Sequence, residues 1–249
     1  MTTVGVLHPG EMGAAVGAVA RAEVLWAPEG RSAATAERAR AAGLRAAPLR
    51  ELVEGCDVLL SICPPHAALD VARSVRGFRG IYCDANTIAP ATAREVAEIV
   101  EASGATAVDG GIVGGPPSEP GTRLYLSGAA AAEVAALFEG TALEPISLSA
   151  GIGTASALKM CFAAWTKGSA ALLLAAAAAA EALGVEDALR EEWARSIPEL
   201  PARLERARRS ADAKGWRWVG EMHEIEATLR AVGLPGGFHA AAAEVFDRR

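Results

Sequence analysis

Residues 2–17 read TTVGVLHPGEMGAAVG, and this stretch decides the fold. Residues 4–7 form a short apolar run with strand character, and the residues from Glu11 onward have the small side chains of a helix start. Between these patterns, Gly10 and Gly13 stand at the last two glycine positions of a G-x-G-x-x-G turn, and His8 occupies the first. The stretch therefore predicts a strand, a turn and a helix in immediate succession.

A turn of this kind gathers backbone N–H groups at the positive end of a helix dipole, which favours a bound phosphate. Gly10 would let the backbone approach a pyrophosphate, and Gly13 would let the helix pack closely on the strand. His8 cannot take a positive φ cheaply, so we expect a turn of altered shape. An ordinary strand-to-helix turn is the alternative, but the βαβ pattern that follows favours a dinucleotide. The predicted cofactor contacts in this turn are His8, Pro9, Gly10, Glu11, Met12 and Gly13.

The first 150 residues alternate between strand and helix patterns. Strands are expected at 4–7, 24–27, 57–63, 80–85, 105–111, 123–128 and 143–148, and helices at 14–22, 32–43, 66–75, 89–104 and 130–139. This alternation predicts an α/β domain, residues 1–150, with a Rossmann-type, mostly parallel sheet and helices on both faces.

After residue 150 the strand patterns stop. A long helix is expected at 151–184, followed by helices at 186–196, 199–211, 216–232 and 238–248 that are separated by Pro198, Gly215 and the Pro-Gly-Gly run at 235–237. Residues 151–249 are therefore predicted to form an all-α domain for substrate binding and dimerisation.

Composition excludes several classes of function. The net charge of −6 and pI near 5.4 give no basic footprint for nucleic acid. Cys56, Cys63, Cys83 and Cys161 show no C-x-x-C spacing, so we expect no metal site and a reducing, cytoplasmic location. The start lacks a signal-peptide pattern, and the apolar run at 168–183 is too short for a bilayer, so we expect no membrane partner.

The segment LWAPEGRS at 25–32 bears on which dinucleotide would bind. An acid at the end of the second strand suits the ribose hydroxyls of NAD, and an arginine nearby accommodates the 2′-phosphate of NADP. Glu29 lies near the first position, but Arg31 can pair with a phosphate and Ser32 can cap the next helix and donate to phosphate. A solvated arginine beside a serine cap is the alternative. The pattern favours NADP(H) over NAD(H).

Several motifs, in order, resemble the β-hydroxyacid dehydrogenases, which include 6-phosphogluconate and 3-hydroxyisobutyrate dehydrogenases. P-G-E-M-G (9–13) is similar to the family's G-L-G-x-M-G, and SICPP (61–65) to its strand that ends at a proline. DANTIAPATA (84–93) is similar to D-x-S-T-x-x-P, and VDGGIVGGPPSEPGTRLYLSG (108–128) to D-A-P-V-S-G-G followed by G-T-L. GTASALKMC (153–161) is similar to the G-x-G-x-x-x-K-x-x-x-N helix. The resemblance spans nearly the whole chain and fits a subgroup with a compact helical tail.

The resemblance implies hydride transfer between a hydroxyacid carbon and the nicotinamide, with Lys159 as general acid or base. It also implies cofactor contacts from Cys63, Pro64, Pro65 and Asn86. Independently, Lys159 and Lys167 are the only charged residues from Thr154 to Ala180. Burial in an apolar helix lowers the pKa of a lysine, which suits proton transfer. A lysine that merely extends its ammonium to the helix edge is the alternative.

The chain departs from the family at positions that normally hydrogen-bond the substrate. The family's serine is Val113, followed by Gly114 and Gly115, and its asparagine after the lysine is Ala163. These positions, with Lys167 and His223, are the predicted substrate-binding residues. His223 and Glu224 stand where the family has a Lys-Asp pair, or on a solvated helix face. His239 and the tryptophans are expected in the core or in pocket walls: Trp165, Trp193, Trp216 and Trp218.

The leading hypothesis is an NADP(H)-dependent oxidoreductase that acts on a hydroxyacid or its keto form. An imine reductase-like enzyme and a catalytically silent NADPH-binding regulatory protein are the alternatives, motivated by the altered residues Val113 and Ala163. The helix at 169–183 is apolar nearly all round, which predicts burial on every side. We therefore expect a homodimer formed through the C-terminal helices.

Overall fold

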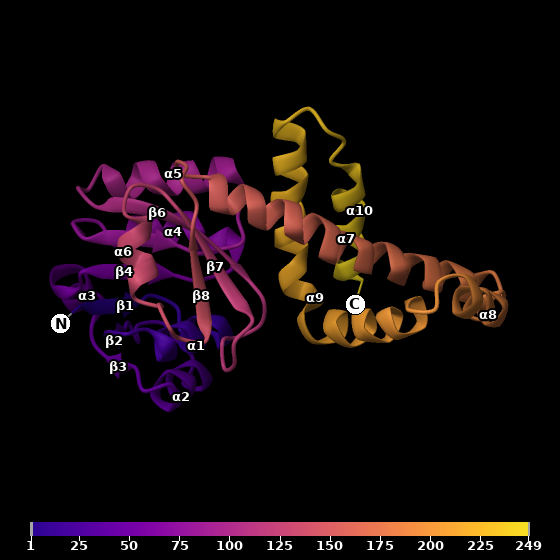
Figure 1. Cartoon of the computed structure of the whole chain (residues 1–249), viewed down its shortest axis with the longest axis horizontal. Coiled ribbons are helices and arrows are strands. Elements are labelled where there is room, and N and C mark those ends of the chain that lie inside the picture. Colours follow the sequence, from indigo (N-terminus) through magenta and orange to yellow (C-terminus); the bar gives the residue numbers. More distant parts are fainter. Residues whose placement is uncertain (1, 249) are drawn as a thin grey trace. The chain divides into compact units, whose positions relative to one another are not determined.

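The computed structural model describes residues 2–248 and divides into two compact units, residues 1–159 and 160–249 (Figure 1). The division falls within the long helix α7 (Thr154–Ala182), whose first residues belong to the α/β unit. The compact α/β unit therefore continues past the expected boundary at residue 150, because the start of α7 packs on the sheet.

The α/β unit is built on one eight-stranded sheet with the order β3-β2-β1-β4-β5-β6-β7-β8. β7 pairs antiparallel with β6, and β8 pairs parallel with β7, so these two strands run opposite to the other six. The described strands are β1 (Thr3–Val6), β2 (Glu23–Trp26), β3 (Arg45–Ala46), β4 (Val58–Ser61), β5 (Ile81–Asp84), β6 (Thr106–Val113), β7 (Thr122–Ser127) and β8 (Leu143–Ser147). The order β3-β2-β1-β4-β5-β6 is that of a dinucleotide-binding sheet, and the predicted fold class is confirmed.

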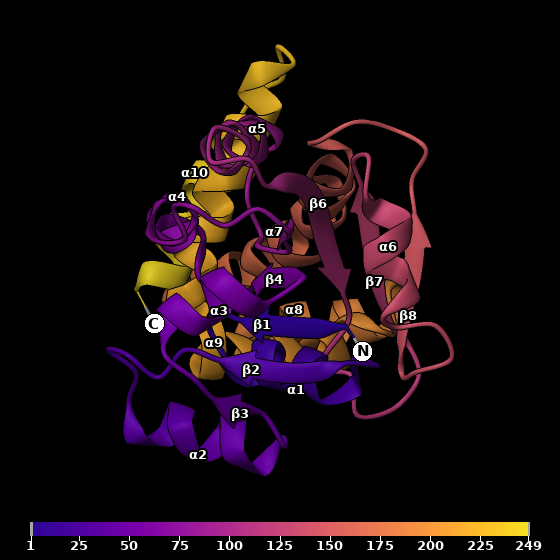
Figure 2. The ribbon, with the colours of Figure 1, turned by 90° about the vertical axis from the view of Figure 1, so that its left-hand side faces the viewer.

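Helices cover both faces of this sheet. They are α1 (Glu11–Val19), α2 (Ala33–Ala41), α3 (Leu49–Gly55), α4 (Ala68–Ser74) after the 3-10 turn η1 (Pro65–Ala67), α5 (Pro90–Glu101) and α6 (Ala131–Ala136). Val16 of α1 and Val134 of α6 lie in one buried cluster. Val71 of α4 and Val96 of α5 lie in a second cluster, on the other face. Figure 2 shows β2, β1 and β4 side by side and α6 next to β7 and β8.

This layering creates a switch point between β1 and β4. The chain leaves β1 for α1, which packs on one face, and leaves β4 for η1 and α4, which pack on the other. Ligands of open α/β sheets bind at such points, outside the carboxyl ends of the strands. The loops at residues 7–13 and 62–65 are both there.

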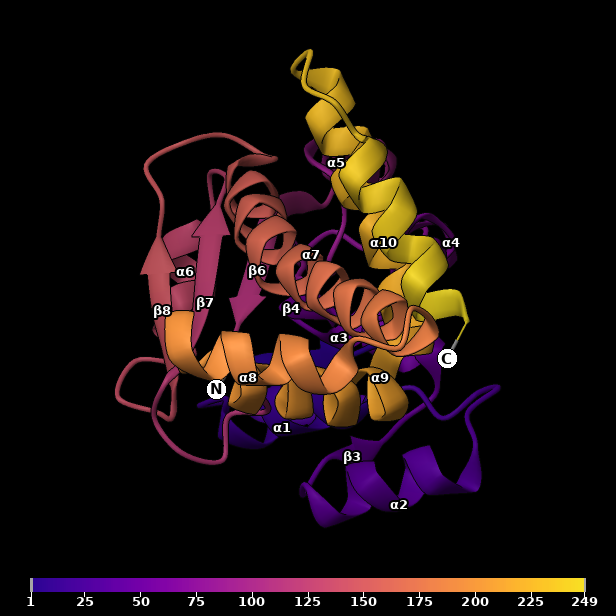
Figure 3. The ribbon, with the colours of Figure 1, turned by 90° about the vertical axis from the view of Figure 1, so that its right-hand side faces the viewer.

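The helical unit contains the rest of α7, α8 (Glu186–Ser196), α9 (Leu200–Ala231) and α10 (Gly237–Asp247). Its core combines Met160 and Leu174 of α7, Met222 and Ile225 of α9, and Phe246 of α10. Figure 3 shows α9 and α10 side by side, in agreement with their many contacts.

The helix around Gly215 was predicted wrongly, and two short elements were missed. Gly215 was expected to end a helix, but α9 continues through it as one helix of 32 residues whose ribbon changes direction along its length (Figure 1). The glycine is buried against α10, where an added Cβ would lie 3.7 Å from the carbonyl oxygen of Phe246. The short elements β3 and α3 were not expected, since a two-residue strand and a seven-residue helix carry almost no periodicity.

Candidate functional site

The turn after β1 is compact, and none of its residues, Gly10 and Gly13 included, has a positive φ. The N–H of Gly10 donates to the His8 carbonyl oxygen at 2.8 Å, and among residues 2–248 no residue other than glycine has a positive φ. A Cβ on Gly13 would lie 2.2 Å from the same His8 oxygen, whereas a Cβ on Gly10 would meet nothing within 4 Å. Gly10, the N-cap of α1, has no side-chain cap, so it leaves open space at the helix N-terminus. The altered turn predicted from His8 is thus a turn without strain.

The other turn residues differ in exposure. Glu11 is exposed at the start of α1, and Met12 is partly buried against the core of the sheet. Met12 therefore packs the turn against the sheet core, whereas the space next to Gly10 is open.

His8 is partly buried in this turn. Burial, and after it the charge of Arg31, lowers the pKa of His8 to about 4. Its Nδ1 atom is buried without a hydrogen-bond partner. The charge of Arg31 also acts on Cys63 of the neighbouring loop, although burial is the main reason that the pKa of this thiol rises to about 12. Arg31 therefore lies at the switch point, close to both loops.

A second arginine reaches the same turn. The Nη1 atom of Arg38, on α2, donates to the Pro9 carbonyl oxygen at 3.5 Å. Sequence reasoning missed this residue, although its position two turns into a predicted helix next to Arg31 and Ser32 was a usable signal. Arg31 and Arg38 together make this edge of the site cationic.

Glu29 and Ser32 are engaged as helix caps. The Glu29 carboxylate accepts from the N–H of Leu49 at 3.1 Å, at the start of α3. The Ser32 hydroxyl accepts from the N–H of Thr35 at 3.2 Å and caps α2, as expected. The Glu29 carboxylate therefore binds the start of α3, where it is not directed at the ribose position that an acid occupies in NAD-binding proteins.

Asn86 holds the ends of β4 and β5 together. Its Oδ1 accepts from the N–H of Cys63 at 2.5 Å, and its Nδ2 donates to Ser61 Oγ at 3.0 Å and to Asp84 Oδ2 at 2.7 Å. Asn86 is buried, so the structure gives it a scaffold role that fixes Cys63 and the adjoining Pro64 and Pro65. The two prolines are partly exposed at the start of η1.

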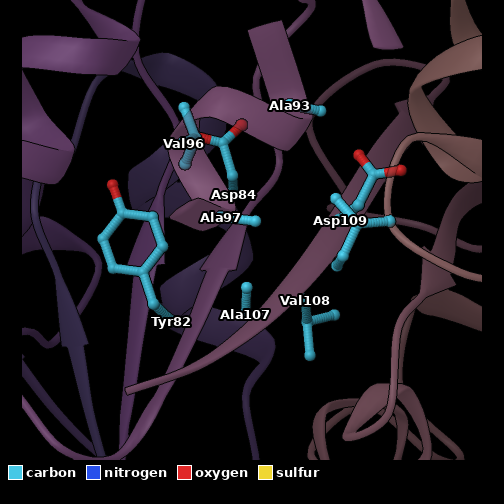
Figure 4. A pocket seen from close by; sticks show the side chains of 9 residues that line it. Tyr82, Asp84, Ala93, Val96, Ala97, Ala107, Val108 and Asp109 are labelled. Atoms are coloured by element: carbon cyan, nitrogen blue, oxygen red, sulfur yellow. The ribbon is translucent and has the colours of Figure 1, made fainter. Parts of the chain in front are cut away.

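Asp84 and Asp109 are buried acids that face each other in register on β5 and β6. They line a small cavity of about 10 Å³ together with Tyr82 and Val96 (Figure 4). Burial raises the pKa of Asp84 to about 7, against the lowering effect of its hydrogen bonds from Asn86. Asp109 binds the start of α7, and neither acid was among the predicted site residues.

Lys159 projects from the first turns of α7 onto the end of β6. Its Nζ donates to the Ile112 carbonyl oxygen at 2.6 Å. Burial lowers the pKa of Lys159 to about 8, as expected for an ammonium in apolar surroundings. The residue is therefore held next to the predicted substrate loop with a proton that it can give or take near neutral pH.

The loop after β6 is shaped by its glycines. Val113 is buried and pairs with Arg123 in the antiparallel register, so its side chain is part of the core. Gly114 has a φ of +129°, and a Cβ there would lie 2.6 Å from Thr122 Oγ1. Thr122 donates to the Gly115 carbonyl oxygen at 2.7 Å, while Gly115 itself is exposed. Gly114 is thus a turn residue, and Gly115 is the open position.

The predicted substrate-binding residues of the helical unit contact other residues of the same unit or are exposed. Ala163 is buried in the helical core. Lys167 forms an ion pair with Glu221 and lies over the Trp218 ring at 5.5 Å from its centroid. His223 is exposed, 3.4 Å from Glu226. The acid that faces Lys167 is Glu221, which sequence reasoning missed by selecting His223 and Glu224.

The predicted positions of His239 and the tryptophans are confirmed for some residues and not for others. His239 is buried, with its Nε2 3.0 Å from the Ala164 carbonyl oxygen, which confirms a core position. Trp193 and Trp218 pack on the helical core. Trp165 and Trp216 are 70% and 69% exposed, so neither is a core residue, and a position in a pocket wall stays a prediction for both.

The helix α7 is longer than the apolar run at 168–183 that was judged too short for a bilayer. By length and composition it could cross a membrane, with a mean hydropathy of 1.4 over its most apolar window, a third of which is buried. However, Lys159 at its start is bound to β6, and Leu173 and Leu174 pack in the helical core. The start of α7 therefore packs in the α/β unit, and its later residues pack in the core of the helical unit.

Comparisons with known proteins find relatives across the chain. A family model described as a domain of unknown function (DUF1932) matches residues 180–249. An uncharacterized 28.5 kDa protein from Methanothermus fervidus is 31% identical over 174 residues, which cover 69% of this chain and 67% of the relative.

Solved structures extend the likeness to the whole chain. The conserved protein MTH1747, of unknown function and described as similar to 3-hydroxyacid dehydrogenases, has a TM-score of 0.73 and 31% identity, covering 99% of this chain and 96% of its own. A 3-hydroxyisobutyrate dehydrogenase from Salmonella typhimurium has a TM-score of 0.76 at 19% identity (100% and 94% covered). A reductive aminase from Aspergillus terreus, in complex with NADPH and ethyl levulinate, has 0.62 at 19% (100% and 93% covered).

The last two likenesses describe the fold, and the first carries sequence identity over nearly the full length of both chains. The motif order, the sheet order and these relatives agree, and the predicted resemblance is confirmed. The chain belongs to the NAD(P)-binding, 3-hydroxyacid dehydrogenase-like family.

Proposed function

We propose that the protein is an NADP(H)-dependent oxidoreductase that interconverts a hydroxyacid and its keto form, with Lys159 as general acid or base. The observation that carries the proposal is the buried Lys159 ammonium, held at the end of β6 with its pKa lowered to about 8. The named neighbours of this fold that act on CH–OH groups, the 3-hydroxyisobutyrate dehydrogenases, support the reaction class.

The turn at residues 8–13 fits a dinucleotide. The open space at Gly10 lies at the N-terminus of α1, where a pyrophosphate would be favoured by the helix dipole. Gly10, Cys63 and Pro64 belong to the two loops that flank the switch point. A bound nicotinamide would supply or accept the hydride at this site.

Arg31 and Arg38 support NADP(H) over NAD(H). Both lie against the turn at His8 and Pro9, and Glu29, the nearest acid of this loop, is engaged at the start of α3. We expect Arg31→Ala and Arg38→Ala each to raise the Kd for NADPH about tenfold or more, since a hydrogen bond to a charged group contributes about 1.5–3 kcal/mol. The Kd for NADH, measured beside it, should change about twofold at most; equal losses for both cofactors would contradict the preference.

Lys159 performs the proton transfer in this proposal. In the reductive direction its ammonium donates a proton to the substrate oxygen, and in the oxidative direction its neutral amine accepts one. Reduction should therefore slow as the pH rises through about 8, and oxidation should accelerate over the same range.

The decisive experiment compares Lys159→Ala with the native protein. We expect the variant to bind NADPH, because Lys159 is not part of the turn at Gly10, and to lose at least about a hundredfold in turnover, typical of a lost acid–base group. Full turnover with retained NADPH binding would refute the role of Lys159. The NADPH affinity of a Gly10→Ala variant tests the cofactor site separately.

The substrate loop is less polar than that of the family pattern. Val113 is buried in the core, and Gly114 and Gly115 are exposed, so the loop offers backbone groups instead of a serine hydroxyl. Lys167, which pairs with Glu221, and His223 lie in the helical unit, and their role in substrate binding stays a prediction. A panel of small keto acids and hydroxyacids with NADPH and NADP⁺ would identify the substrate.

An imine reductase-like activity is the second candidate. Val113 and Ala163 are departures from the hydroxyacid pattern, and a reductive aminase shares the fold. Cyclic imines and ketone–amine pairs in the same panel would separate the two reactions. NADPH binding without oxidation of NADPH across the panel would instead favour a catalytically silent, regulatory protein.

A homodimer through the C-terminal helices is also proposed. One side of α7 carries apolar and small residues at alternating spacings of three and four, which we call the α7 stripe: Phe162, Trp165, Ser169, Leu172, Ala176 and Ala179. Trp165 and Leu172 are 70% and 72% exposed in the single chain. Such spacing is the pattern of helix-on-helix packing, and a second copy would bury it. A soluble, cytoplasmic protein without nucleic-acid or membrane partners fits the acidic composition.

A further inference from the structure

The start of α7 is bound to one buried carboxylate on β6. Asp109 Oδ2 accepts from the N–H of Gly153 at 2.9 Å and from the N–H of Ser156 at 3.0 Å, and Oδ1 accepts from Ser156 Oγ at 2.5 Å. These donors surround the first turn of a 29-residue helix. Backbone N–H groups at a helix start have no partner within the helix, so a carboxylate there both satisfies them and complements the dipole.

Ser127 extends this contact to a second strand. Its Oγ donates to Asp109 Oδ2 at 3.0 Å and accepts from the N–H of Ala155 at 3.1 Å. Asp109, Ser127 and Ser156 are all buried. The helix start is therefore tied to β6 and β7 through a network that water does not reach.

The same strand then sets the position of Lys159. Gly111, two residues after Asp109 and on the same face of β6, lets α7 approach so closely that an added Cβ would lie 2.9 Å from the Ala155 carbonyl oxygen and 3.1 Å from Lys159 Cβ. One residue later, the Ile112 carbonyl oxygen receives the Lys159 Nζ at 2.6 Å. Asp109 thus binds the start of α7, and Gly111 permits the short distance between α7 and β6. Ile112 then binds the Lys159 ammonium.

We propose that Asp109 is a positioning residue for Lys159. It binds the first turn of α7 and so holds the lysine ammonium, just over one turn further along, against the end of β6. This inference rests on the proposed function for its catalytic meaning, but the position of Lys159 can be measured without turnover.

The test compares Ser156→Ala, Ser127→Ala and Asp109→Asn with the native protein. Since the chain has only three lysines, Lys159, Lys167 and Lys214, trace acetylation followed by mass spectrometry can give the pH dependence of each amine. Val134→Ala is the matched control, because Val134 is fully buried on α6 and its truncation destabilises the unit without touching α7. kcat, KM and the Kd for NADPH are measured for the same variants.

We expect the Lys159 pKa to rise from about 8 toward its ordinary value of 10.5 in Ser156→Ala, because a loosened helix start exposes the ammonium to water. kcat should fall about tenfold or more, as small displacements of catalytic groups do, with the Kd for NADPH within about twofold. Asp109→Asn should have the larger effect; if it does not fold, the two serine variants carry the test. Lys214 and the control should be unchanged.

Two results would overturn the proposal. Native Lys159 titration and native kcat in folded Ser156→Ala and Ser127→Ala would show that the network does not position the lysine. An equal shift in Val134→Ala would show that general loosening is the cause. A shifted Lys159 titration in the serine variants of a protein that oxidises no substrate would support the positioning role while refuting the proposed function.

Discussion

Gly10 and Gly13 belong to one turn but lack a side chain for different physical reasons. A Cβ at Gly13 would overlap the His8 carbonyl oxygen at 2.2 Å, so the turn itself requires this glycine. A Cβ at Gly10 would meet nothing within 4 Å, so no group of the chain requires a glycine there. The open space at Gly10 would let the proposed pyrophosphate approach the backbone closely.

Alanine at each position separates the two roles. Gly10→Ala should leave the free energy of unfolding within about 0.5 kcal/mol of native, but raise the Kd for NADPH about tenfold or more by blocking the close approach of a phosphate. Gly13→Ala should destabilise the protein by about 1–3 kcal/mol or more, through overpacking. Urea titration and fluorescence titration with NADPH measure both. Unchanged NADPH affinity in Gly10→Ala would place the phosphate elsewhere.

His8 gives the stability a pH dependence. The unfolded chain takes up a proton on His8 near pH 6.5, whereas the folded chain resists protonation down to about pH 4. The contribution of His8 to stability is therefore present above pH 6.5 and is lost as the pH falls toward 4. Asp84, whose folded pKa is raised to about 7, acts with the opposite sign, so the native curve alone is ambiguous.

The variant His8→Asn isolates the histidine, because an amide does not titrate. The difference in the free energy of unfolding between native protein and His8→Asn should change steadily from pH 6.5 to pH 4, with the native protein losing more, and should be flat from pH 7 to pH 8. Urea unfolding at each pH measures it. A constant difference throughout would mean that folding does not lower the pKa of His8.

At the scale of elements, the contact between β6 and α7 depends on Gly111. Gly111→Ala would bring a Cβ to 2.9 Å from the Ala155 carbonyl oxygen and 3.1 Å from Lys159 Cβ, so α7 must move away from the strand. We expect a loss of about 1–3 kcal/mol in stability, together with a decrease in kcat. Gly55→Ala at the end of α3 is the matched control, since its Cβ meets nothing within 4 Å. Equal stability of the two variants would show that α7 is not tightly seated.

Elements with strong periodicity or clear punctuation were predictable from sequence. The Ser32 cap of α2 was recognised, and a mostly parallel sheet followed from the βαβ alternation. What sequence could not provide is pairing across distant segments. Asp109 with Ser156, Glu29 with Leu49, and Lys167 with Glu221 each join residues from different elements, and no local pattern encodes those partners.

Across the whole molecule, the two units carry different parts of the proposal. The α/β unit contains the turn at Gly10, both arginines and Lys159 with the network that holds it. The helical unit contains a buried core of its own and most of the α7 stripe. The motifs predicted an α/β part followed by a helical part, because strand patterns stop where the long apolar helix begins, but the predicted boundary at residue 150 lies before the division within α7. The single chain nevertheless leaves large apolar side chains exposed along that helix.

A second copy of the chain would cover this surface, and Leu172 tests it. The side chain is 72% exposed near the middle of the α7 stripe, so Leu172→Glu should not disturb the fold of the single chain. In a helix-on-helix interface, however, it would place charges in an apolar seam, which costs several kcal/mol and should convert a dimer to a monomer. Ala178→Glu is the matched control, because Ala178 is exposed on α7 but lies off the stripe. Light scattering measures the mass of each variant. A native protein that is monomeric, or a Leu172→Glu variant that stays dimeric beside an unchanged control, would remove the α7 stripe as the interface.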